Sequence, residues 1–274
     1  MSMIERISIP SFWRDAAVPF LEMRSIEDGR QVCYGRHSHE IFSIGAITHG
    51  QSTYSNREID RPVSQGTIVL MNPGDVHACN PVDGEPWSYL MLYVDPHWLG
   101  GLQQARGQTD VPTFQRFACI ASEDAELYQR LLQLRDTLLD PAQGARDKIA
   151  QATAFFRLML ERLPLEGEHD ESINPRLEQA AVLIHQHCGE TLNLDTLCQA
   201  AELSPSQLIR GFKQRYGMTP HAYLLNRRIQ FAHSRLKSGA PLAEVALEAG
   251  FADQAHFQRT FKHFLAATPG QYRG

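Results

Sequence analysis

Arginine and lysine recur at one spacing in two places near the end of the chain. Residues 210–213 are RGFK and residues 259–262 are RTFK, so that the two motifs lie 49 residues apart. A guanidinium can read the edge of a base in a major groove, and an ammonium group can pair with a backbone phosphate. The two motifs therefore predict contacts with nucleic acid, if the fold turns both of them outward.

Three histidines form a second group that can do chemistry. His37 and His39 stand two residues apart in RHSH, and His77 follows the tight turn PGD at residues 73–75. In a strand, alternation would direct His37 and His39 to one face, where His77 could join them. Imidazole rings in such a group can hold a metal ion or form hydrogen bonds with a ligand. The residues alone leave both roles open.

The elements that carry the basic motifs repeat with them. Each copy predicts a short helix, a tight turn and a longer helix, which is the helix-turn-helix arrangement. Ser204 followed by Pro205 can cap the first long helix, and Asp253 can cap the second. At the offset of 49 residues, identical residues pair as follows: Ala200 with Ala249, Arg210 with Arg259, Phe212 with Phe261, Lys213 with Lys262, Thr219 with Thr268, Pro220 with Pro269, and Tyr223 with Tyr272.

Each long helix divides into an apolar face and a polar face at helical spacing. A solvated face on stacked helical hairpins would explain one such helix, but two capped copies in a basic region favour nucleic-acid recognition. In the first helix, Leu208, Ile209, Phe212 and Tyr216 share the inner side, and Ser206, Gln207, Arg210, Lys213 and Gln214 share the outer side. In the second helix, Phe257, Phe261, Phe264 and Leu265 are expected inside, and His256, Arg259, Lys262 and His263 outside.

The charge of the chain is divided unevenly. The net charge of the whole chain is −5, yet residues 175–274 hold 11 Lys and Arg against 7 Asp and Glu. A basic last third on an acidic body predicts that only this third contacts a polyanion.

The segment between the two repeats predicts a spacer helix. Residues 221–238 have no helix breaker, and ~20 helical residues span ~30 Å. Because successive major-groove half-sites lie ~34 Å apart, such a spacer would let one subunit enter two grooves.

The tandem unit closely resembles the AraC/XylS family of bacterial transcription regulators. The resemblance covers about residues 175–274 and depends on AEVALEAGF at 243–251, RTFK at 259–262 and TPGQYR at 268–273. It implies one recognition helix per unit in adjacent major grooves of double-stranded DNA, with the two lysines on phosphate. Ile209 departs from the polar residue expected there, and it could contact a thymine methyl group. The residues implied to contact DNA are Ser206, Gln207, Ile209, Arg210, Lys213, Gln254, His256, Gln258, Arg259 and Lys262.

The region up to about residue 115 predicts β-structure. Apolar runs at 41–47, 66–71 and 87–94 alternate with turns rich in Gly and Pro, which suits a small barrel or a double-sheet roll. With its histidine motifs, this region resembles the cupin barrel that usually serves as the sensor of these regulators. The expected fold is α+β with two domains: a cupin-like barrel at about 20–115 with a helical pair, and an all-α double helix-turn-helix.

The cupin resemblance implies a pocket for a small-molecule effector. Metal-binding cupins add a glutamate a few residues after the paired histidines, where this chain has Ser43 and Ile44, so that hydrogen-bonded pocket histidines are favoured over a metal site. No cofactor is expected. Trp87, Tyr89 and Tyr93 alternate on one strand and could line the pocket or fill a core. The candidate pocket residues are His37, His39, His77, Trp87 and Tyr89.

Residues 122–163 change to a helical period and predict a pair of helices. Their apolar stripes, which include Leu127, Leu131, Leu134 and Leu138, favour a dimer interface, with packing on the barrel or on the DNA-binding domain as alternatives. The acidic segment PLEGEHDESIN, residues 164–174, predicts a linker. The expected domains are therefore residues 1–163 and 175–274.

Composition indicates a cytoplasmic protein. The five cysteines are odd in number and form no C-x-x-C pair, which argues against a disulfide framework or a zinc finger. The first residues lack the apolar run of a signal peptide, and no stretch approaches the ~20 apolar residues that span a bilayer. No membrane partner is expected.

Together these features predict a sequence-specific transcription regulator that is not an enzyme. We expect a ligand-responsive activator that acts as a homodimer, with RNA polymerase as a further candidate partner. The alternative is a metal-dependent cupin enzyme, such as a dioxygenase or isomerase, fused to a DNA-binding module. A structural nucleoid protein without sequence preference is a weaker third hypothesis.

Overall fold

A computed structural model describes residues 10–30, 32–107, 111–167 and 174–273 of the chain. The chain divides into two units. The first comprises residues 1–169 without two short segments, Cys33–Ser38 and Asp75–Ala78, and these segments belong with residues 170–274 to the second unit.

The first unit is built on two antiparallel sheets. One has the order β1-β2-β8-β3-β6-β9, and the other has the order β5-β4-β7. The strands are β1 (Ser11–Arg14), β2 (Leu21–Ile26), β3 (Phe42–His49), β4 (Gln51–Asn56), β5 (Ile59–Ser64), β6 (Ile68–Met71), β7 (His77–Pro81), β8 (Ser88–Val94) and β9 (Ala121–Ser122).

These sheets are open, which corrects the expected closed barrel. The six-stranded sheet ends at β1 and β9, and the three-stranded sheet ends at β5 and β7. Alternation and turns specify where strands lie, but closure depends on strand tilt and stagger, which the sequence pattern does not contain. The two-domain α+β class is confirmed.

The β region also ends earlier than expected. Helix α2 (Pro96–Ala105) occupies part of the segment that was predicted to be β-structure up to residue 115. Asp95 caps it by accepting a hydrogen bond from the amide of His97 at 2.8 Å, and Pro96 is its first residue. An Asp-Pro pair is a typical helix start, and the strand reading overlooked it.

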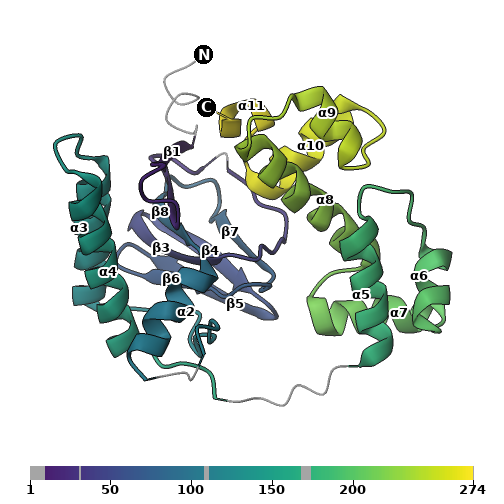
Figure 1. The fold of residues 1–274 in the computed structure, drawn as a ribbon, viewed down its shortest axis with the longest axis horizontal. Coiled ribbons are helices and arrows are strands. Elements are labelled where there is room, and N and C mark those ends of the chain that lie inside the picture. Colours follow the sequence, from purple (N-terminus) through teal and green to yellow (C-terminus); the bar gives the residue numbers. More distant parts are fainter. Residues whose placement is uncertain (1–9, 31, 108–110, 168–173, 274) are drawn as a thin grey trace. The chain divides into compact units, whose positions relative to one another are not determined.

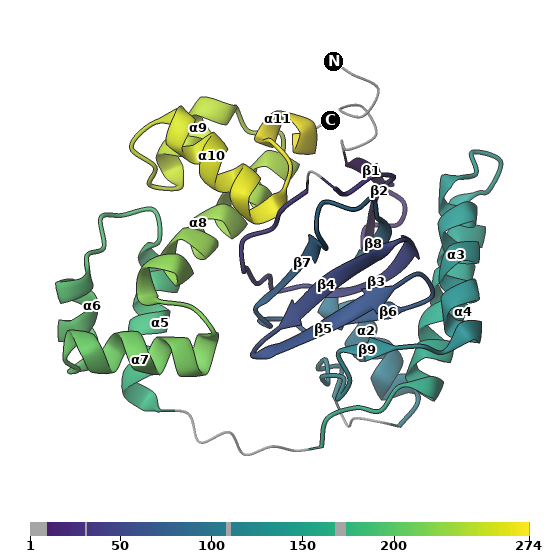
Figure 2. The ribbon, with the colours of Figure 1, turned by 180° about the vertical axis from the view of Figure 1, so that it is seen from behind.

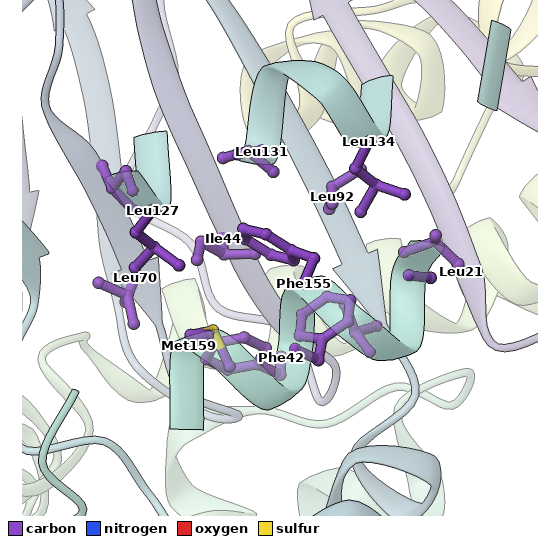
Figure 3. Packing of buried hydrophobic residues seen from close by; sticks show 14 of the residues in the cluster. Leu21, Phe42, Ile44, Leu70, Leu92, Leu127, Leu131, Leu134, Phe155 and Met159 are labelled. Carbon is purple, nitrogen blue, oxygen red and sulfur yellow. The ribbon is translucent and has the colours of Figure 1, made fainter. Parts of the chain in front are cut away.

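Residues 122–163 form the predicted pair of helices, and the pair covers one face of the six-stranded sheet (Figure 1). They are α3 (Ala125–Leu139) and α4 (Ala145–Arg162). Leu127 and Leu131 are fully buried, and they pack with Ile44 of β3 and Phe155 of α4 in the core that Figure 3 shows. The interpretation of this leucine stripe as a dimer interface is therefore wrong, because the stripe is the core of the first unit.

The predicted linker is partly tied to the first unit. The amide of Ala118 donates to the carbonyl of Pro164 at 2.9 Å, and the amide of Glu166 donates to the carbonyl of Arg116 at 2.8 Å. An ion pair between Arg116 and Glu166 reinforces this pairing. Of the expected linker 164–174, residues 168–173 lie outside the described residues.

The second unit holds two bundles joined by one long helix, α8 (Pro220–Lys237). Helices α5 (Pro175–His187), α6 (Leu194–Ala201) and α7 (Pro205–Tyr216) gather at one end of α8. Helices α9 (Leu242–Glu248), α10 (Gln254–Leu265) and α11 (Pro269–Arg273) gather at its other end, and Figure 2 shows the same arrangement from behind. The predicted helix-turn-helix elements and the spacer helix are confirmed.

Side-chain caps mark the starts of three of these helices, and two of them, Ser204 and Asp253, are caps that the sequence predicted. Asn174 caps α5, Asp253 caps α10, and Ser204 forms a reciprocal capping box with Gln207 at the start of α7. Such caps satisfy backbone amides that would otherwise lack partners.

Among the described residues, no helix combines the length and the apolar character that crossing a bilayer requires.

Candidate nucleic-acid interface and effector face

The two long helices of the repeats, α7 and α10, are held by aromatic anchors on their inner faces. Phe212 of α7 is fully buried in a cluster with Leu177 of α5 and Leu197 of α6. In α10, Phe257 and Phe261 are fully buried, and their rings meet edge-on at 5.5 Å. Truncating a buried Phe typically costs ~3–5 kcal/mol, so these anchors strongly fix which face of each helix points outward.

The outer faces carry cations that are free of ion pairs. Arg210 and Lys213 on α7, and Arg259 and Lys262 on α10, are exposed, and none of the four side chains has a hydrogen-bond or ion-pair partner among the residues that the structure describes. In contrast, Arg235 of α8 binds both carboxylate oxygens of Glu248, at 2.7 and 3.0 Å. Unpaired, fully solvated cations at matching positions of a repeat are suited to bind phosphates and base edges.

The other predicted DNA-contact residues divide into three groups. Ser206, Gln254 and Gln258 are exposed on the same outer faces. The carboxamide oxygen of Gln207 already accepts hydrogen bonds from the amide and hydroxyl of Ser204, at 3.0 and 2.7 Å. Two further predicted residues are half-buried at the edges of their helices: Ile209, and His256, whose ring meets Phe251 at 5.2 Å.

The spacer between the two helix-turn-helix units is α8, which has 18 residues. At 1.5 Å per residue this helix is about 27 Å long. That length is close to one turn of B-form DNA, which is ~34 Å.

The structure brings two of the three histidines together. The backbones of His37 and His77 pair with each other, and their ring centroids lie 4.4 Å apart. Nδ1 of His39 instead lies 2.8 Å from the carbonyl oxygen of Ile41, and its Nε2 lies 3.1 Å from the hydroxyl of Ser43. The alternation argument failed because β3 begins only at Phe42, so that residues 37–39 are not a regular strand.

His77 is buried in its neutral form. Burial, and secondarily the neighbouring His37, lowers the pKa of His77 to about 3. Its Nδ1 lies 2.9 Å from the carbonyl oxygen of Asp75. In the described part of the chain, no group of three His, Cys, Asp or Glu side chains could hold a metal ion.

A polar row crosses the face of the six-stranded sheet that α3 and α4 do not cover. In the strand register Glu22 pairs with Tyr93, and Tyr93 pairs with Ser43. Arg24 follows in the next row of β2 and is only 3% exposed. Sequence reasoning missed Glu22, Arg24 and Ser43, although two charges at alternate positions of the strand LEMRSI were a visible signal.

The predicted aromatic residues lie on the same face and bury polar atoms there. Trp87 and Tyr89 are almost fully buried and stack at 4.9 Å. Burial raises the pKa of Tyr93, and the guanidinium of Arg24 opposes that shift. The indole Nε1 of Trp87 and Oδ1 of Asn56 are buried without a hydrogen-bond partner in the described residues. A buried polar atom without a partner costs ~1–3 kcal/mol, which a bound molecule can recover.

Comparison with protein-family models matches both units. Residues 22–167 match the AraC-like ligand binding domain, and residues 197–274 match a helix-turn-helix domain.

Regulators of transcription are among the curated proteins that this chain resembles. Over 254 residues it is 25% identical to the HTH-type transcriptional activator RhaS of Escherichia fergusonii, which covers 89% of this chain and 88% of that protein. Over 166 residues it is 40% identical to the HTH-type transcriptional regulator MtrA of Neisseria gonorrhoeae, which covers 57% of this chain and 54% of that protein.

Among solved structures, ToxT from Vibrio cholerae O395 matches with a TM-score of 0.56 and 11% identity, over 96% of each chain. At that identity the likeness shows a shared two-domain fold.

Proposed function

Because this chain belongs to the AraC family of transcriptional regulators, we propose that one subunit binds double-stranded DNA in two successive major grooves under the control of a small molecule. Family membership makes the chain a transcriptional regulator with a helix-turn-helix DNA-binding region and a ligand-binding domain. The finer roles of its residues are our proposal.

One observation carries the DNA-binding proposal: both recognition helices present an unpaired arginine and an unpaired lysine at the same positions of the repeat. We assign Arg210 and Arg259 to base edges, because a guanidinium can bind guanine through two hydrogen bonds. Lys213 and Lys262 lie one helical turn further on and bind phosphate. Ser206, Gln254 and Gln258 supply further polar contacts, and Ile209 is suited to a thymine methyl group.

Gln207, which helps to cap α7, and the half-buried His256 have secondary roles in this proposal. Gln207 stabilises the start of α7 through its bonds to Ser204, and His256 packs against Phe251. Gln207 is exposed but would have to give up its bonds to Ser204 to contact DNA, and the half-buried ring of His256 would have to leave Phe251.

For the effector we propose a site among the buried side chains on the face of the six-stranded sheet opposite α3 and α4. Trp87 and Tyr89 offer flat apolar surface, while Arg24, His39 and Tyr93 offer polar groups around it. A ligand that accepts a hydrogen bond from the indole of Trp87 would satisfy a donor that now lacks a partner. His37 and His77 pair with each other, and we leave them out of this site.

The effector would act by binding more tightly to one arrangement of the protein than to another, since only such a difference can shift an equilibrium. We propose an activator, as its relative RhaS is. This activator would contact RNA polymerase, act as a homodimer and reside in the cytoplasm. The names of the relatives support a role that is not enzymatic.

Selection of duplexes from a random pool by the whole purified chain tests the DNA-binding proposal. We expect two conserved blocks of bases, about 10 base pairs apart from centre to centre. A single block per subunit, or no enrichment, would contradict it.

A thermal-shift screen of small metabolites against the whole chain tests the effector proposal. A ligand that binds only the folded state raises the melting temperature. The same ligand should raise the melting temperature of a Trp87→Phe variant less. A ligand with equal effects on both proteins would place the site elsewhere.

A further inference from the structure

The two helix-turn-helix units contact each other through bare backbone at two glycines. Gly189 lies in the connection between α5 and α6, and Gly250 lies in the turn between α9 and α10. A β-carbon on Gly250 would stand 2.6 Å from the carbonyl oxygen of Gly189. A β-carbon on Gly189 would overlap the carbonyl oxygen of Glu248. The two connections therefore pack more closely than any side chain would allow.

Arg228 of α8 holds this contact from one side. Its Nε donates to the carbonyl oxygen of Cys188 at 2.7 Å, and its Nη2 donates to that of Glu190 at 2.8 Å. These carbonyls flank Gly189. The same guanidinium lies 5.9 Å from the ring centroid of Phe251, the residue after Gly250. One side chain thus connects the loop of the first helix-turn-helix unit with the turn of the second helix-turn-helix unit.

A planar fork of donors suits this position better than a single ammonium group. The two carbonyl oxygens belong to residues 188 and 190, and the guanidinium binds both at once. Carbonyl groups that follow a helix lack partners and carry partial negative charge, which favours a cation beside them. The pair of Arg235 with Glu248 adds a second tie between α8 and α9, next to the same contact.

We propose that Arg228 and the contact of Gly189 with Gly250 form a clamp between the two helix-turn-helix units. This clamp fixes the distance and angle between α7 and α10. The clamp thereby sets how many base pairs separate the two halves of the operator. A single connecting helix such as α8 would allow the two helix-turn-helix units to rotate about its ends. A second contact beside the helix prevents that rotation. Arg228 is a positioning residue here, because it acts on the recognition helices and does not touch DNA.

The proposal rests on the proposed function, in which both recognition helices bind one duplex. Its first test uses an operator selected by the wild-type chain from a random duplex pool. Binding of Arg228→Ala and Gly189→Ala is measured on the full operator, on duplexes with either half scrambled, and on duplexes with one base pair inserted between the halves. Lys237→Ala, an exposed lysine on the same helix, is the charge-matched control.

We expect both variants to lose about tenfold in affinity for the full operator, because binding of the second helix depends on its effective concentration at the second groove. Affinity for each half-site should stay within about twofold of the wild-type value, since neither residue touches DNA. The inserted base pair should weaken the Arg228→Ala protein less than the wild type. Equal losses on full and half operators, or no loss, would overturn the clamp.

A second measurement needs no DNA. Amide hydrogen exchange should become about tenfold faster in peptides that cover residues 188–193 and 247–252 of Arg228→Ala, because the contact opens locally more often. Peptides from the middle of α7 and α10 should keep their protection. If the wild-type chain selects no two-part operator, the proposed function fails, and the exchange result alone judges the clamp. Unchanged exchange in both loops would refute it.

Discussion

The salt dependence of DNA binding should reveal the phosphate contacts of Lys213 and Lys262 one by one. Both ammonium groups are exposed and have no ion-pair partner in the described residues, so each is available to displace a counterion from DNA. Every phosphate that a protein neutralises contributes ~0.9 to the slope of log affinity against log salt.

The size of the effect follows from that slope. Between 50 and 200 mM salt, one phosphate contact accounts for a loss of about 3.5-fold in affinity. Lys262→Ala should therefore lose about 3.5-fold less than the wild type over this range, and the double variant with Lys213→Ala about 12-fold less. Substitution of an exposed residue that has no partner should change the free energy of unfolding by less than ~0.5 kcal/mol.

The assay is fluorescence anisotropy of a labelled operator duplex at five or six salt concentrations. Arg130→Ala on α3 is the matched control, since it removes one exposed positive charge from the first unit. Its slope should equal that of the wild type. The assignment of Lys262 to phosphate is refuted if its variant keeps the wild-type slope, or if Arg130→Ala flattens the slope equally.

Three further predictions concern stability. Leu131→Ala, at a fully buried position of the first-unit core, should lower the free energy of unfolding by ~2–5 kcal/mol in urea titrations, and a loss below 1 kcal/mol would contradict its place in the core. Ser204→Ala should cost ~1 kcal/mol through loss of the capping box, and circular dichroism during urea unfolding would show no change if the cap were unimportant. The pKa of His77 is about 3 in the folded state and 6.5 ordinarily, so the unfolded state binds the proton more readily, and stability should fall as pH drops from 6.5 toward 3. Between pH 7 and pH 5 this loss of unfolding free energy amounts to about 2 kcal/mol. The His77→Gln variant should lack that part of the pH dependence. An unchanged pH dependence in the variant would show that His77 is not buried in its neutral form.

Much of the second unit could be predicted from the sequence, because its signals are local. Ser204, Asp253 and Pro220 mark helix starts within a few residues, and apolar residues at helical spacing mark the buried faces. The repeat at 49 residues then supplied the tandem arrangement. The clamp at Gly189 and Gly250 could not be predicted, because it joins residues far apart in sequence that carry no side chain.

The first unit was harder to predict because its decisive features are not local. Whether sheets close depends on how their end strands are placed, and turn spacing does not encode that. His39 was grouped with His37 by an alternation that holds only inside a strand, and β3 starts after both residues. Arg24 was overlooked because a charge inside an apolar strand is ordinarily taken as solvent-facing, whereas here it is buried.

The central claim, that one subunit places its two recognition helices in successive major grooves, can be tested by protection of guanine N7 from methylation on the selected operator. The wild type should protect two clusters of guanines about 10 base pairs apart. Arg210→Ala should lose protection in one cluster only, and Arg259→Ala in the other only. Loss of the same guanines in both variants, or protection confined to half a turn of DNA, would contradict the account.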